Sequence, residues 1–331
     1  MRLRDYRMRS RSEKDGGHGA GIARGLDIAH DHDHDWRHCM RLLWRGALLL
    51  LPALLGVAGA AQPPAAPIEA FVSILPQKYF VERIGGKHVA VSVMVGPGQS
   101  PETYEPTPNK LSRLAGARMY FGIGVEFEEV WMKRIASANP RMRIVDMRRG
   151  IPSRELERSE GTPAPAAQPG LADPHVWTSP PLAKLMAANI RDALSELDPA
   201  HQAAYDANCE AFASDLDRLD HDIRVLLKNL STRKFMVFHP AWGYFADSYG
   251  LKQIPIEAGG KEPGARTLAQ VIDIGRRERV KVIFVQAQFS RRAAETIAQA
   301  IGARVVAVDP LAEDYMNNLR QVAWDFAKAM Q

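Results

Sequence analysis

The alternation of apolar and polar positions predicts short strands separated by helices. In the first half, strands are expected at 71–75, 88–95, 118–121 and 143–146, with helices at 77–84, 109–115 and 126–138. In the second half, strands are expected at 234–238, 253–256, 281–286 and 304–308, with helices at 241–249, 266–278, 290–301 and from 313 to the end. Strands separated by helices of this length are typical of βαβ units. The expected fold class is α/β, with two lobes that each contain a parallel sheet flanked by helices.

The middle of the chain is predicted to form two longer helices. One helix is expected to end at Leu197, and a second is expected from about Pro199 to Asn229. A row of apolar residues lies on one face of this second helix, spaced 4, 3, 4, 3, 4: Phe212, Leu216, Leu219, Ile223, Leu226 and Leu230. At 1.5 Å per residue this helix would span roughly 45 Å, the length of a two-lobed molecule. A coiled-coil partner would produce the same seam, so dimerisation is the alternative to burial within the chain.

The N-terminal region has the pattern of an exported protein. Arg41 and Arg45 precede an apolar stretch that ends near Val57, and Ala58-Gly59-Ala60 provides an A-x-A cleavage site. The stretch is shorter than the ~20 residues that a membrane-spanning helix needs. We therefore expect a signal peptide at 40–60 and a mature protein in the periplasm. Residues 1–39, with their alternating His and Asp, form an N-terminal extension that we expect to have no role in the mature protein.

Charge argues against a nucleic-acid partner, and the cysteine content argues against an internal disulfide. The first 60 residues hold ten Arg or Lys against seven Asp or Glu, so +3 of the net charge of +5 lies in the segment expected to be removed. The remainder is nearly neutral and has no basic block, which argues against a nucleic-acid partner. Cys39 precedes the signal and Cys209 lies in a predicted helix, so no internal disulfide is expected.

Two histidines and a carboxylate are candidate metal ligands. His175 lies in Asp-Pro-His-Val-Trp, His239 in Val-Phe-His-Pro-Ala-Trp, and Asp309 at the end of an apolar run. We expect all three at the mouths of strands or in the turns just past them, where side chains converge on a crevice. Two imidazoles and a carboxylate from distant segments are ligands that divalent transition metals recruit. The alternatives are core histidines with satisfied hydrogen bonds, and a helix cap for Asp309.

These segments, with 101–108 (Pro-Glu-Thr-Tyr-Glu-Pro-Thr-Pro) and 282–289 (Val-Ile-Phe-Val-Gln-Ala-Gln-Phe), resemble the substrate-binding proteins of zinc and manganese ABC importers, the cluster A-I metal-binding receptors. The resemblance covers Ile68 to the C-terminus. It implies an N-terminal lobe (61–198) and a C-terminal lobe (231–331) joined by one long rigid helix (199–230), with one metal between them. The metal, Zn²⁺ or Mn²⁺, would be handed to the importer's membrane permease. We expect a monomer that is not an enzyme.

The resemblance also assigns a ligand set. His175, His239 and Asp309 match the second, third and fourth family ligands, and Glu102 stands where the first is usually a histidine. Replacing a nitrogen by a carboxylate oxygen favours harder ions such as Mn²⁺ or Fe²⁺, without excluding Zn²⁺. The loop at 153–172 also lacks the histidines that zinc receptors of this family often carry. The alternative for Glu102 is a solvated carboxylate with water in its place, and Glu105 is a less favoured substitute.

Two other classes of function stay open at this stage. A metallohydrolase would hold the ion with three ligands and activate water at an open position, although the chain has no H-E-x-x-H motif. A receptor for a metal chelate or another small organic ligand would use Trp177, Trp242 and Tyr244, which we expect instead to form a dry wall around the metal. Glu257 and Glu262 are expected to be solvated or salt-bridged.

Overall fold

The computed structural model describes residues 66–158, 172–257 and 262–331. The predicted extension, the signal peptide and most of the loop predicted after Ser153 lie outside the described residues. The chain from Gln62 to Gln331 forms one compact unit. None of the helices in the described ranges has both the length and the apolar character needed to cross a membrane.

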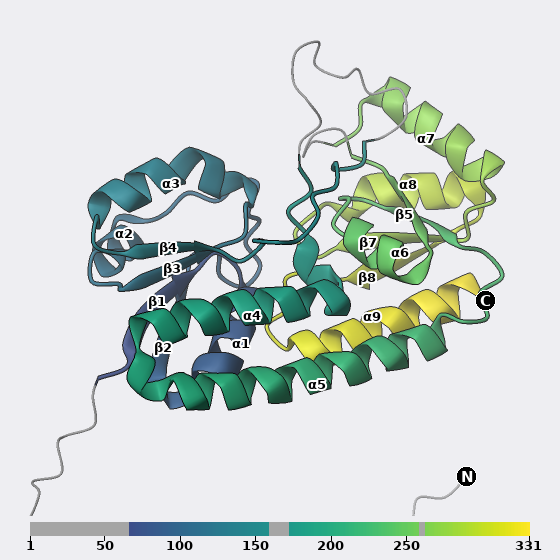
Figure 1. Cartoon of the computed structure of the whole chain (residues 1–331). Coiled ribbons are helices and arrows are strands. Elements are labelled where there is room, and N and C mark those ends of the chain that lie inside the picture. Colours follow the sequence, from purple (N-terminus) through teal and green to yellow (C-terminus); the bar gives the residue numbers. More distant parts are fainter. Residues whose placement is uncertain (1–65, 159–171, 258–261) are drawn as a thin grey trace, which may run out of the picture. The chain divides into compact units, whose positions relative to one another are not determined.

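The first half of this unit is a four-stranded parallel sheet in the order β2-β1-β3-β4. Its strands are β1 (Ile68–Val72), β2 (Val89–Val93), β3 (Met119–Gly122) and β4 (Arg143–Asp146). Its helices are α1 (Leu75–Gly85), η1 (Gly86–His88), α2 (Pro108–Leu114) and α3 (Glu126–Ala138). In Figure 1, α2 and α3 lie on one side of the sheet and α1 on the other. β3 is apolar and buried along its whole length, because helices cover both faces of the sheet.

The second half repeats this connectivity in a sheet of order β6-β5-β7-β8. Its strands are β5 (Lys234–Val237), β6 (Lys252–Pro255), β7 (Val282–Gln286) and β8 (Arg304–Val308), and its helices are α6 (Gly243–Tyr249), α7 (Ala265–Arg277), α8 (Arg291–Ile301) and α9 (Tyr315–Met330). Alternate residues of β5 and β7 pack into two different hydrophobic clusters. Phe235 and Phe284 pack on Phe326 of α9, whereas Met236 and Ile283 pack with residues of α7 and α8. The predicted two-lobe α/β fold is confirmed.

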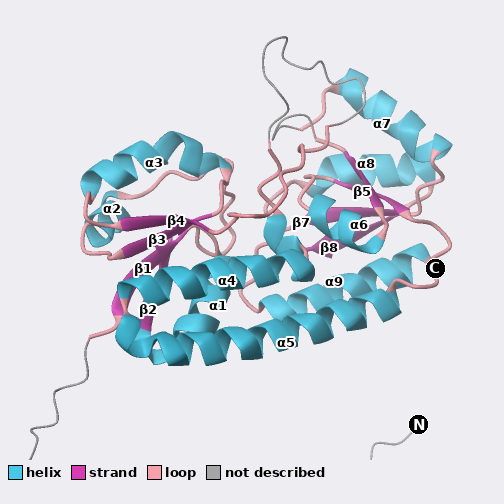
Figure 2. Cartoon of the chain, in the orientation of Figure 1, coloured by secondary structure: helices cyan, strands magenta, loops and turns pink. Residues whose placement is uncertain are grey.

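Between the sheets run η2 (Val176–Thr178), α4 (Pro180–Leu197), η3 (Pro199–His201) and α5 (Gln202–Leu226). α5 is the predicted long helix, and its 25 residues span about 37 Å. Its seam residues Phe212, Leu216, Leu219 and Ile223 are fully buried, and α1, α4 and α9 of the same chain pack against the helix. The seam is therefore covered within the chain, and Figures 1 and 2 show the C-terminal helix α9 running beside α5.

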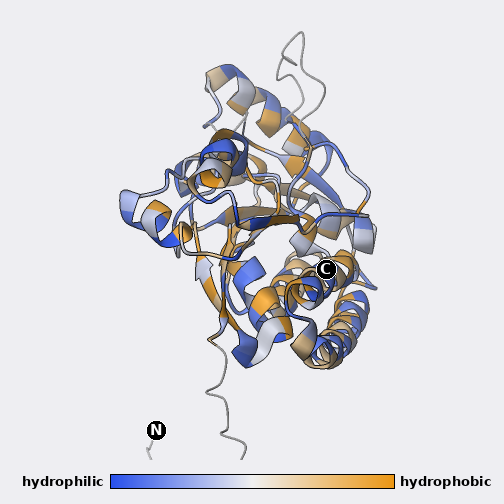
Figure 3. Cartoon of the chain, turned by 60° about the vertical axis from the view of Figure 1, so that its left-hand side comes forward, coloured by the Kyte–Doolittle hydropathy of each residue, from blue (hydrophilic) through white to orange (hydrophobic). Residues whose placement is uncertain are grey.

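Side-chain capping moves the start of the first helix. β1 ends and α1 begins earlier than the sequence predicts, because Gln77 Oε1 accepts hydrogen bonds from the backbone N–H groups of Ser73 and Ile74 at 2.9 and 3.0 Å. These bonds end the strand at Val72 and start the helix at Leu75. Figure 3 shows hydrophobic residues along the strands and alternating hydrophobic and hydrophilic residues around the helices.

Candidate metal centre

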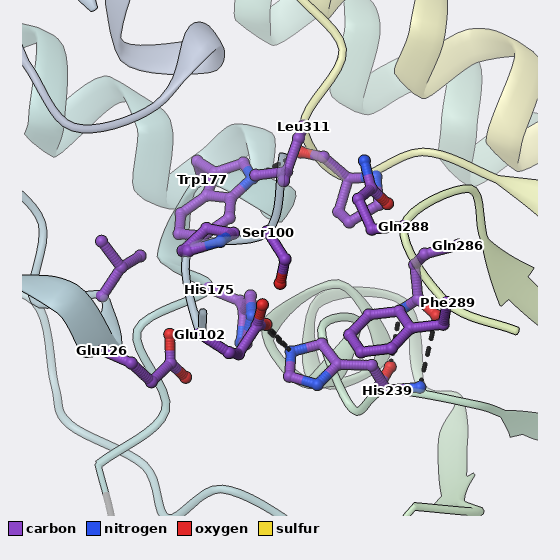
Figure 4. Close-up of a pocket in the computed structure, with 13 residues that line it drawn as sticks. Ser100, Glu102, Glu126, His175, Trp177, His239, Gln286, Gln288, Phe289 and Leu311 are labelled. Atoms are coloured by element: carbon purple, nitrogen blue, oxygen red, sulfur yellow. Dashed lines mark hydrogen bonds and ion pairs between the residues drawn. The ribbon is translucent and has the colours of Figure 1, made fainter. Parts of the chain in front are cut away.

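A small pocket beyond the carboxyl ends of the strands contains three of the four candidate ligands (Figure 4). Glu102 lies in the loop after β2, and His239 lies in the turn after β5. His175 differs from the prediction, because it directly precedes the short helix η2 instead of following a strand. The pocket has a volume of about 10 Å³, which is room for one species the size of a water molecule.

The donor atoms of these three residues lie close together. His239 Nε2 is 3.1 Å from His175 Nε2 and 3.1 Å from Glu102 Oε1. Two nitrogens bound to one tetrahedral metal at about 2.0 Å lie about 3.3 Å apart, so the imidazoles are already near ligand spacing. The second oxygen, Glu102 Oε2, is buried without a hydrogen-bond partner among the described residues.

The two imidazoles nevertheless bond to each other. Their Nε2–Nε2 hydrogen bond occupies the lone pair of one ring, which a metal would need. Across 66–158, 172–257 and 262–331, no three or more His, Cys, Asp or Glu side chains are arranged to hold a metal ion. The pocket thus brings candidate donor atoms of three residues to short range.

A carboxylate contacts Nδ1 of each imidazole, on the side of the ring that points away from the pocket. His175 Nδ1 lies 2.7 Å from Asp173 Oδ1, and His239 Nδ1 lies 3.0 Å from Glu257 Oε1. An ionised carboxylate only accepts hydrogen bonds, so each Nδ1 carries a hydrogen and each Nε2 faces the pocket. Metal-bound histidines use the same arrangement, in which the far nitrogen donates to a carboxylate.

The bond between the imidazoles requires one ring to carry two hydrogens. Burial lowers the pKa of His239, but the hydrogen bond to Glu257 and the charge of Glu102 outweigh it and raise this pKa to about 9. Burial also raises the pKa of Glu102 by more than the attraction of His239 lowers it. At neutral pH His239 is therefore an imidazolium, and its positive charge lies where a cation would bind.

Arg154 supports the carboxylate behind His175. Its Nη1 lies 2.7 Å from Asp173 Oδ2, and its Nε lies 3.0 Å from Asp247 Oδ2 on α6. Burial raises the pKa of Asp173, but hydrogen bonds from His175 and Arg154 bring it below its ordinary value. The Arg154 side chain is only 16% exposed, although it lies near the start of the loop at 153–172. Gly243 leaves space for it, since a Cβ there would lie 1.4 Å from Arg154 Nη1.

Asp309 lies outside the pocket. Its Oδ1 accepts hydrogen bonds from the backbone N–H of Leu311 at 2.8 Å and from Gln288 Nε2 at 3.3 Å. It lines a neighbouring cavity of about 200 Å³, and Gln288 and Leu311 line both spaces. The bond to Leu311 is a local turn contact of the kind offered by the capping alternative. The structure does not bring Asp309 together with the other three residues, and its role as a ligand stays a prediction.

Other side chains named in the sequence analysis can also be located. Glu257 is buried and forms an ion pair with His239, in agreement with the salt-bridged role expected for it, and Glu262 is exposed. Of the three aromatic residues expected around the metal, Trp177 lines the pocket. Trp242 is buried against Phe245 and Phe326, and Tyr244 lies under the Arg154 guanidinium.

Comparison with known proteins identifies the family. The family model described as zinc-uptake complex component A, periplasmic (ZnuA), matches residues 71–329. The chain is 28% identical over 286 residues to the high-affinity zinc uptake system protein ZnuA of Bacillus subtilis, covering 81% of this chain and 88% of that protein. It is 25% identical over 222 residues to the manganese-binding lipoprotein MntA of the same species, covering 66% and 70%. A crystal structure of ZnuA matches with a TM-score of 0.74 and 43% identity, over 80% of this chain and 100% of that chain. The chain therefore belongs to the ZnuA family of periplasmic zinc-uptake components.

Proposed function

We propose that this chain is a periplasmic receptor that captures one divalent transition metal ion and delivers it to the membrane permease of an ABC importer. Family membership supports the transport role. The observation that carries the proposal is the pair of buried imidazoles, with Nε2 atoms 3.1 Å apart and a carboxylate behind each ring. A pocket of about 10 Å³ suits a single ion and leaves no room for an organic substrate, which favours binding over catalysis and over a chelate receptor.

The proposed ligands are Glu102, His175, His239 and Asp309. The first three already surround the pocket, and Asp309 adjoins Pro310 and Leu311, which line it. Two carboxylates and two neutral imidazoles would neutralise a divalent cation. The mixed oxygen and nitrogen set accommodates Zn²⁺ as well as Mn²⁺ or Fe²⁺, and Glu102 in place of a histidine favours the harder ions.

The proposed organisation completes this function. A signal peptide at 40–60 directs export, lobes at 61–198 and 231–331 hold the metal, and the segment 199–230 joins them. We propose a monomer without a nucleic-acid partner. Burial of the α5 seam within the chain supports the monomer, because it accounts for the apolar face that suggested a coiled coil.

Metal analysis and isosteric variants test this proposal. Protein purified from the periplasm is expected to bind one metal ion per chain, measured by elemental analysis and by competition titration with Zn²⁺ and Mn²⁺. Glu102→Gln, His175→Gln and His239→Gln are each expected to weaken binding by more than about a hundredfold, since loss of supporting partners alone costs about 10–100-fold. The exposed residues Glu105 and His221 supply the matched controls Glu105→Gln and His221→Gln, expected to bind normally.

The same titration addresses metal preference. Glu102→His is expected to shift the relative affinity from Mn²⁺ toward Zn²⁺, because it replaces a hard oxygen donor by nitrogen. Substoichiometric metal, or hydrolysis of ester or phosphate substrates by the metal-loaded protein, would contradict the receptor assignment.

A further inference from the structure

The indole of Trp177 connects η2, the short helix that directly follows His175, with the segment that carries Asp309. Trp177 is the middle residue of η2 and is 1% exposed. Its Nε1 donates a hydrogen bond to the Pro310 carbonyl at 2.7 Å. From the other side, the Tyr315 hydroxyl donates to the Trp177 carbonyl at 2.8 Å. One buried hydrogen bond therefore joins η2 to the chain between β8 and α9, and a second joins η2 to the first residue of α9.

That chain segment has no regular structure of its own. β8 ends at Val308 and α9 begins at Tyr315, so Asp309 lies in an irregular stretch. Asn318 Nδ2 holds the Asp309 carbonyl at 2.6 Å, and Glu313 forms an ion pair with Lys78. Among these contacts, the indole bond is the one that reaches η2, which directly follows His175.

We propose that Trp177 is a positioning residue that sets the place of Asp309 relative to the two imidazoles. This inference rests on the proposed function and on Asp309 as a ligand. The ring of Pro310 fixes its own φ, so a bond that holds its carbonyl also restrains the neighbouring Asp309 backbone. Without the indole N–H, the Pro310 carbonyl would lose its donor in a buried environment, and the segment would shift to satisfy it.

A matched pair of variants separates the indole bond from packing. Trp177→Phe keeps an aromatic ring but removes the donor. Trp242→Phe makes the same change at a fully buried tryptophan, whose Nε1 has no hydrogen-bond partner among the described residues. We expect Trp177→Phe to weaken Zn²⁺ binding about tenfold and Trp242→Phe to leave it unchanged, measured by competition with a chromophoric chelator. Equal losses in the two variants would overturn the inference.

A double-mutant cycle with Asp309→Asn tests whether Trp177 acts through Asp309. We expect Trp177→Phe to cause no further loss of Zn²⁺ affinity in the Asp309→Asn background, whereas additive losses would overturn the inference. Normal Zn²⁺ binding by Asp309→Asn alone would overturn the ligand assignment as well. Weak binding by Asp309→Asn with normal binding by Trp177→Phe would overturn only the positioning role.

Thermal melting of each metal-free variant verifies that it folds. Tyr315→Phe provides a second variant for the case in which Trp177→Phe does not fold. It removes the hydrogen bond to the Trp177 carbonyl and keeps the ring. A smaller loss of affinity, again absent in the Asp309→Asn background, is expected. Unchanged binding by a folded Tyr315→Phe, with Trp177→Phe unfolded, would count against the proposal.

Discussion

Raising the pH from 6 to 8 is expected to strengthen metal binding about a hundredfold, because a metal must displace the proton on His239 Nε2. The pKa of His239 is raised to about 9, so nearly every metal-free molecule carries this proton below that pH. A histidine ligand must be neutral, and each pH unit makes removal of the proton about tenfold easier. At pH 7 the proton therefore reduces the apparent affinity by about a hundredfold, or about 3 kcal/mol.

Two measurements check this expectation. Competition against a chelator of known pH dependence gives the slope of affinity with pH. Calorimetric titration at pH 7 in two buffers of different ionisation enthalpy counts the protons, and about one per metal is expected. Glu257→Gln removes a carboxylate that raises the pKa of His239, so its affinity should level off at lower pH than that of the natural protein. A flat affinity between pH 6 and 8 with no proton release would refute the reasoning.

The same proton links stability to pH in the metal-free protein. The folded-state pKa of His239, about 9, lies above its ordinary 6.5, so the protonated form stabilises the fold. This contribution is fully present below pH 6.5 and is lost as the pH rises through about 9. For a buried imidazole it is on the order of 3 kcal/mol. The urea midpoint of metal-free protein should therefore fall between pH 7 and 10, and an unchanged midpoint would count against a raised pKa.

Three substitutions extend these tests. Asp173→Asn removes the carboxylate behind His175 and is expected to weaken metal binding about 10–100-fold; normal affinity in a competition titration would exclude an orienting role. Gly243→Ala places a Cβ against the Arg154 guanidinium, so it should displace that side chain from Asp173 and weaken metal binding in the same assay. An unchanged affinity would show that the ion pair between Arg154 and Asp173 is not needed for metal binding. Phe326→Ala removes the fully buried ring that stacks on the β7 phenylalanine at 3.9 Å; it is expected to cost about 3–5 kcal/mol in urea unfolding, and a loss below about 1 kcal/mol would mean that neighbouring aromatic rings fill the space.

Elements with a strong local signal could be predicted to the residue. The bounds of β4, β8 and α3 agree with the sequence prediction. The pattern predicts a first strand that continues to residue 75, whereas β1 ends at Val72, since the hydrogen bonds that Gln77 accepts from the backbone leave no trace in the apolar pattern. Local patterns record which face is buried, and they do not record a single side chain that ends an element.

The site could be predicted in part for the same reason. Glu102, His175 and His239 lie in distinctive motifs, and the structure brings them together. Arg154 and Glu257 could not be predicted, because their partners Asp173 and His239 lie 19 and 18 residues away in sequence without any period connecting them. Only tertiary packing makes these contacts, and they determine the orientation and charge of the imidazoles.

The short distances between the candidate ligands limit what metal binding has to move. With the proton present, the two Nε2 atoms lie 3.1 Å apart, a few tenths of an ångström from the spacing around one tetrahedral ion. Core residues of both sheets, α5 and α9 form a single hydrophobic cluster, which resists separation of the lobes. With Asp309 as the proposed fourth ligand, binding would need loss of one proton and a local turn of Asp309 away from Gln288, and little lobe closure. A receptor built in this way would exchange one proton for one metal ion, so lower pH would favour release of the metal.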